Sequence, residues 1–108
     1  MIIKNLQYDK DFGWLYIAIP DSKKNSLKVT VYDDSGETIE PVSQDYQKSA
    51  TVDGYGAGGN LKLKAGYYYT YHGIKKDYIT VTVKNITGQL IWAKADKYGL
   101  HGDEWTSY

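Results

Sequence analysis

The chain has 108 residues, and its 13 basic and 13 acidic side chains give a formal net charge of zero. This balance provides no general attraction to phosphate backbones, so we predict that nucleic acid is not a partner. The absence of cysteine excludes a disulfide scaffold and a thiolate metal site, and the length suits one domain spanning residues 1–108.

The N-terminal sequence from Met1 lacks the apolar run of a signal peptide. The longest apolar stretch, Trp14 to Ile19, is far shorter than the roughly 20 residues that a membrane-spanning helix needs. The sequence therefore predicts no membrane span and synthesis in the cytoplasm, with a virion or a cell surface as alternative final locations.

A two-residue hydrophobic period runs through most of the chain and predicts β-strands. The first predicted strand is the apolar run of residues 14–19. The next alternates over residues 27–32, and the Asp-Asp-Ser-Gly sequence of residues 33–36 supplies a turn. Residues 37–42 can return as a hairpin partner, and Pro41 places that partner at a sheet edge.

The middle of the chain, residues 43–60, is the least regular part. Residues 43–48 are polar and predict a loop or a helical turn, whereas residues 49–52 predict a short strand. Residues 54–59 formally match G-x-G-x-x-G, the dinucleotide-binding pattern, but strand-like sequence follows where that motif needs a helix. We therefore interpret this stretch as a mobile loop with Tyr55 as a contact residue.

Residues 61–65, 67–72, 78–84 and 89–93 predict four further strands. Between the last two, residues 85–88 predict a hairpin loop in which Gly88 takes a positive φ. Residues 94–108 form a C-terminal tail that we expect to be packed by its aromatic anchors. The fold class is therefore all-β: an antiparallel β-sandwich of about seven to eight short strands, with a small β-barrel as the alternative.

Residues 63–68 read Leu-Lys-Ala-Gly-Tyr-Tyr and match the L-x-x-G-x-Y pattern of a tyrosine corner, at Leu63, Gly66 and Tyr68. Together with the strand and turn of residues 29–36, this motif resembles immunoglobulin-like and transthyretin-like β-sandwich domains. The resemblance implies that the Tyr68 hydroxyl bonds back to the backbone of the corner. It implies no particular function, because such sandwiches have many functions.

Tyrosine is the unusual component: there are 12 tyrosines and three tryptophans but only one phenylalanine. Because a phenol hydroxyl needs a partner or water, we expect many rings at the boundary with water. Two arguments compete in the run of residues 67–72. The corner motif turns Tyr68 inward and exposes Tyr67, Tyr69 and Tyr71 as a platform for sugars, whereas the hydrophobic count turns those three rings into the core.

Candidate metal and catalytic groups lack the arrangement that such sites need. Asp33, Asp34 and Glu37 are calcium-type ligands but also ordinary turn residues, so calcium binding at this turn stays open. Residues 101–104 hold three zinc-type ligands, and His72 is the only other histidine. The sequence has no nucleophile elbow, H-E-x-x-H motif or Walker loop. We predict no metal, no cofactor and no enzymatic activity.

The sequence thus predicts a non-enzymatic recognition module that binds a glycan or a protein surface through its Tyr-rich strands or its Gly-rich loop. The predicted contact residues are Tyr55, Tyr67, Tyr69, Tyr71, Trp92 and Trp105. One alternative is a structural or assembly protein, such as a virion, tail or surface component, that forms a homo-oligomer. Another is an inhibitor or effector that binds a single host protein.

Overall fold

The computed structural model describes residues 2–9, 13–52, 61–74 and 78–97. These residues contain ten β-strands and one short 3-10 helix. In chain order the elements are β1 (Asn5–Asp9), β2 (Trp14–Ile19), η1 (Asp21–Lys23), β3 (Leu27–Tyr32), β4 (Thr38–Ile39), β5 (Ser43–Gln47), β6 (Ala50–Val52), β7 (Leu61–Leu63), β8 (Gly66–Tyr71), β9 (Tyr78–Asn85) and β10 (Leu90–Lys97).

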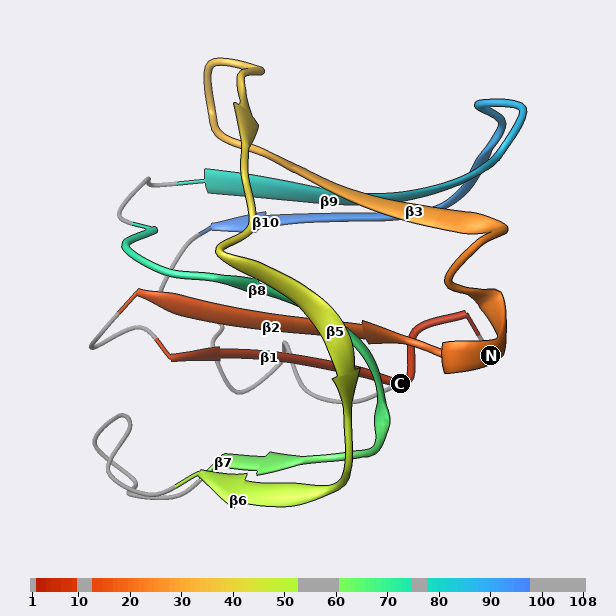
Figure 1. The fold of residues 1–108 in the computed structure, drawn as a ribbon. Helices are drawn as coiled ribbons and strands as arrows, with labels where there is room; N and C mark the ends of the chain where they lie inside the picture. Colours follow the sequence, from red (N-terminus) through yellow and green to blue (C-terminus); the bar gives the residue numbers. More distant parts are fainter. Residues whose placement is uncertain (1, 10–12, 53–60, 75–77, 98–108) are drawn as a thin grey trace.

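Two four-stranded antiparallel sheets face each other and form a sandwich (Figure 1). Sheet A has the strand order β1-β2-β8-β5, and sheet B has the order β10-β9-β3-β4. The chain passes from sheet B to sheet A between β4 and β5, while β6 and β7 form a separate two-stranded ribbon. This arrangement confirms the predicted all-β sandwich, and within the described residues no strand pairing joins the two sheets into a barrel.

The hydrophobic core lies between the sheets and uses alternate residues of each strand, as the two-residue period predicts. The register places Val29 opposite Val83 and Val31 opposite Val81, so the inward positions of β3 and β9 coincide. The side chains of this core that are almost fully buried are Ile3, Leu6, Leu15, Ile17, Ile19, Val29, Val31, Tyr69, Tyr71, Ile74, Ile79, Val81 and Val83.

A second, smaller cluster covers part of the outer face of sheet A. It consists of Tyr16, Ala18 and Tyr68, with Trp14 packed against it. The buried Asn5 side chain donates from Nδ2 to the Tyr68 hydroxyl at 2.8 Å. That hydroxyl in turn donates to the Lys64 carbonyl, so Tyr68 makes the backbone hydrogen bond expected of a tyrosine corner. The resemblance to particular sandwich families stays a prediction.

The two hairpin turns of sheet B, between β3 and β4 and between β9 and β10, are closed by the same hydrogen-bond pattern. The Asp33 carboxylate Oδ1 accepts hydrogen bonds from the backbone and hydroxyl of Ser35 and from the Glu37 backbone. In the turn between β9 and β10, Asn85 Oδ1 accepts the equivalent bonds from Thr87 and Gln89. Each turn ends on a glycine with φ near +85°, which confirms the predicted positive φ at Gly88.

Three elements differ from the sequence prediction. The strand β1 was not predicted, because its sequence Asn-Leu-Gln-Tyr-Asp contains a single aliphatic residue, Leu6, and so shows no clear hydrophobic period. Residues 43–47, predicted as a loop or helical turn, form the edge strand β5, whose mostly exposed side chains carry no hydrophobic period. The last strand, β10, extends to Lys97, past the predicted start of the tail at residue 94. The remainder of the tail, residues 98–108, lies outside the described residues.

Candidate functional site

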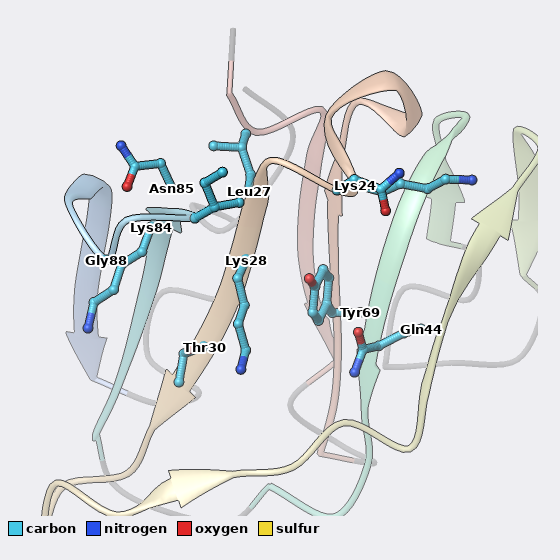
Figure 2. Close-up of a pocket in the computed structure, with 11 residues that line it drawn as sticks. Lys24, Leu27, Lys28, Thr30, Gln44, Tyr69, Lys84, Asn85 and Gly88 are labelled. Carbon is cyan, nitrogen blue, oxygen red and sulfur yellow. The ribbon is translucent and has the colours of Figure 1, made fainter.

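A pocket of about 500 Å³ opens on one side of the sandwich, where an edge of sheet B faces the edge of sheet A (Figure 2). It forms there because β4 pairs only with Val31 and Tyr32, so the described structure has no strand beside residues 27–30 of β3 on that side. Across the gap, β5 is the edge strand of sheet A. The segment after η1 and the turn between β9 and β10 complete the walls.

Two opposed polar walls face this gap. Figure 2 shows Lys28 and Thr30 on the β3 side and Gln44 and Tyr69 on the β5–β8 side, with the Tyr69 hydroxyl pointing toward the gap. Gln44 and Tyr69 occupy register partners on β5 and β8, so their side chains leave the same face of sheet A. The geometry therefore presents hydroxyl, amide and ammonium groups to one small volume.

Tyr69 has two roles, because its ring lies in the core while its hydroxyl reaches the pocket. Only 4% of the residue is exposed. Burial raises its pKa, a hydrogen bond with the Val29 backbone lowers it, and the nearby Tyr67 raises it. The net effect is a raised pKa, so the phenol stays protonated at neutral pH and can act as a hydrogen-bond donor.

Among the described residues, three lysines and no acidic residue line the pocket. Lys24 is already engaged, because its Nζ lies 3.7 Å from an Asp21 carboxylate oxygen and 5.9 Å from the centre of the Tyr67 ring. In Figure 2 the Lys24 side chain points away from Lys28. Lys28 and Lys84 are register partners on β3 and β9, and neither forms an ion pair with any described residue. The pocket is therefore electropositive.

The rim of the pocket has an apolar side, at the turn between β9 and β10. Ile86 lines the pocket and is 80% exposed. Leu90, at the start of β10, is also exposed. An isoleucine so far out of the core offers a contact surface to whatever enters the pocket.

The six predicted contact residues do not come together as one surface. Tyr67, Tyr69 and Tyr71 all face the core, as the hydrophobic count suggested, and Tyr71 is 1% exposed. Tyr67 is half-buried and packs edge-on against Tyr69, so the three rings form no open platform for stacking. Trp92 is half-buried against the same core. The other two predicted contacts, Tyr55 and Trp105, lie outside the described residues, as does the Gly-rich loop.

Sequence reasoning selected Tyr69 but missed Lys28, Lys84, Thr30 and Gln44. The two lysines are outward positions of alternating strands, and such lysines usually only face solvent. Their place in one pocket wall depends on the pairing of β3 with β9, which brings together residues far apart in the chain. Gln44 was missed together with its strand.

Other candidate sites take ordinary structural roles or lie outside the description. The Asp33 carboxylate is used by its own turn, and the described residues contain no group of three or more His, Cys, Asp or Glu side chains suited to a metal. The ligand types at residues 101–104 fall outside those residues. No helix in the described part of the chain is long and apolar enough to cross a membrane.

Comparisons of the chain with models of known protein families, with curated proteins and with solved structures give no significant match.

Proposed function

We propose that this protein is a non-enzymatic recognition module that binds a saccharide in the pocket between β3 and β5. One observation carries the proposal: a concave site of about 500 Å³ is lined by hydroxyl, amide and ammonium groups from both sheets. Ligand pockets typically have volumes of about 300–1,000 Å³, so this one suits a ligand of one or a few sugar residues.

The chemistry of the lining favours a sugar over a protein surface. Protein partners generally bury a flatter patch with an apolar centre, whereas the hydroxyls of a sugar need several directed hydrogen bonds in a small volume. Thr30, Gln44 and the Tyr69 hydroxyl supply such groups. Ile86 on the rim can contact the C–H face of a sugar ring. Recognition then depends on hydrogen bonding, since the buried tyrosine rings are not open to stacking.

A glycan array with labelled protein, followed by calorimetric titration of the best ligand, tests this proposal. Gln44→Ala removes an exposed pocket amide without disturbing the core. We expect it to weaken binding by about tenfold, which corresponds to the loss of one or two hydrogen bonds. Ser43→Ala on the same strand, outside the pocket lining, is the matched control and should bind as the wild type does. Absence of any response across the array, or a Gln44→Ala variant of wild-type affinity, contradicts the proposal.

A homo-oligomeric assembly protein is the second candidate, and the edge strand β5 favours it. Val42 and Tyr46 on this edge are 58% and 51% exposed. Exposed edge strands with apolar side chains are sites for pairing with another chain. Light scattering over a concentration series should show a symmetric oligomer that Tyr46→Lys dissociates. A monomer at high concentration counts against assembly and leaves saccharide binding unaffected.

A further inference from the structure

Two lysines stand directly opposite each other in sheet B, at the wall of the pocket. Lys28 of β3 and Lys84 of β9 are register partners, and both line the pocket. Like charges at directly opposed positions of an antiparallel pair destabilise the sheet. Figure 2 shows the two side chains leaving neighbouring strands with their ammonium groups apart. Because the arrangement lowers folding stability, a role of the two charges in binding explains it better than a structural role does.

The third pocket lysine shows what an ordinary structural lysine does in this fold. Lys24 approaches the Asp21 carboxylate at 3.7 Å and lies over the Tyr67 ring. In the part of the chain that the structure describes, no acidic group neutralises Lys28 or Lys84, and the pocket lining itself includes no Asp or Glu. Their two charges are therefore available to a ligand.

The neutral groups around these lysines are suited to an oxyanion. The Thr30 hydroxyl and the Gln44 amide can each donate a hydrogen bond into the pocket, and the Tyr69 hydroxyl, which also has a hydrogen bond with the Val29 backbone, lines it. Asn85 is less available, because its side chain is already bonded within its own turn. Donors from two walls, together with two ammonium groups, can surround a carboxylate or a sulfate group while leaving the Ile86 side of the pocket for a sugar ring.

We propose that Lys28 and Lys84 bind the carboxylate or sulfate group of an acidic saccharide, which makes this pocket selective for anionic glycans. The inference rests on the proposed saccharide-binding function and adds the charge class of the ligand. Hydrogen bonds from ammonium groups to an anion are stronger than neutral ones, and partly exposed charge pairs are screened by salt. Affinity should therefore depend on both lysines and on ionic strength.

The test uses the full chain and four probes: a sulfated heparin hexasaccharide, a galacturonate hexasaccharide, a neutral cellohexaose and inorganic sulfate. Each is titrated calorimetrically at low and at high sodium chloride concentration. We expect one or both acidic saccharides to bind at least about tenfold more tightly than cellohexaose, and this preference to shrink in high salt. Inorganic sulfate should bind more weakly than the acidic saccharides, because it lacks the sugar contacts.

Charge-neutralising variants locate the site. Lys28→Gln and Lys84→Gln should each weaken binding of the acidic saccharide by about tenfold, while Lys48→Gln, which removes the same charge from an exposed lysine outside the pocket lining, should not. Far-ultraviolet circular dichroism checks that all three variants fold. The inference is overturned if the Lys28→Gln and Lys84→Gln variants bind the acidic saccharide as tightly as the wild type does. It is also overturned if inorganic sulfate binds as tightly as the acidic saccharide.

The two proposals fail in different ways. Cellohexaose binding as tight as that of the acidic probes, weakened by Gln44→Ala but insensitive to the lysine variants, overturns the anionic selectivity and supports the saccharide site. Failure of every saccharide to bind, acidic or neutral, overturns saccharide recognition and the charge selectivity with it.

Discussion

Replacing Tyr68 by phenylalanine removes a single oxygen atom that joins β8 to β1 and to the segment between β7 and β8. The Tyr68 hydroxyl accepts a hydrogen bond from Asn5 Nδ2 at 2.8 Å and donates one to the Lys64 carbonyl. Asn5 is fully buried, and its Oδ1 has no hydrogen-bond partner among the described residues. After the substitution, the Asn5 amide also loses its acceptor, and no water has easy access to replace it.

The expected loss of stability follows from these contacts. An ordinary hydrogen bond contributes about 1 kcal/mol net, and a buried donor left without a partner costs about 1–3 kcal/mol. Lys64 is exposed, so water can satisfy its carbonyl and that bond contributes little to the loss. We therefore expect Tyr68→Phe to lower the free energy of unfolding by about 2–3 kcal/mol, most of it through Asn5.

A double-mutant cycle separates the Asn5 bond from other effects of the missing hydroxyl. Asn5→Leu has a similar volume and removes the whole polar group, so the double variant Asn5→Leu with Tyr68→Phe should lose only about 1 kcal/mol. Urea unfolding followed by tryptophan fluorescence measures each variant, with Tyr46→Phe on the exposed edge as control. A Tyr68→Phe variant within about 0.5 kcal/mol of wild type, or strictly additive losses in the cycle, would refute this reasoning.

Three further predictions concern the backbone, the pH dependence and the pocket. A Cβ on Gly13 would lie 2.6 Å from the Ile74 carbonyl oxygen at a φ of +71°. We therefore expect Gly13→Ala to lower the free energy of unfolding, measured by thermal unfolding, by about 2–4 kcal/mol. The control Gly36→Ala, with a φ of +85° and no atom within 4 Å of its Cβ, should lower it by only about 1 kcal/mol. Burial raises the pKa of three core phenols above 10.0: Tyr68, Tyr69 and Tyr71. Because the folded pKa exceeds the unfolded one, their contribution to stability is complete below about pH 10 and is lost as the pH rises further. The part of the tyrosinate absorbance that comes from these three rings should therefore appear together with unfolding, and their ionisation in the folded protein near pH 10 would contradict this. Lys28→Gln should raise the free energy of unfolding by a few tenths of a kcal/mol, about what relief of a cross-strand repulsion gives, and an unchanged or lower stability in calorimetry argues against that repulsion.

The fold class was predictable because the core strands show their period directly. The alternation in β3 and β9 marks Val29, Val31, Val81 and Val83 as inward residues, and they meet across the sheet. The edge elements were not predictable in the same way. In β5 the backbone pairs with β8 while the side chains face solvent, so Ser43–Gln47 carries no hydrophobic signal of a strand.

The candidate site was much less predictable, because it depends on pairings between distant segments. Lys28 and Lys84 are unremarkable until the register places them opposite each other. The tyrosine run shows the same limit: Tyr68 and Tyr69 point to opposite faces of β8, and both are buried, because a second cluster covers part of the outer face. Alternation identifies two faces, but it does not reveal that each of them is covered.

The hydrogen bond between the Tyr69 hydroxyl and the Val29 backbone has a consequence for solubility. Val29 lies in the part of β3 that β4 does not cover, where unpaired backbone groups could hydrogen-bond to strands of other molecules and start a fibril. The phenol occupies part of that backbone. A ligand in the pocket and the Tyr69 side chain would then protect the same stretch of β3 against fibril growth. Tyr69→Phe should therefore shorten the lag time of aggregation measured by thioflavin fluorescence. An unchanged lag time would show that other groups provide that protection.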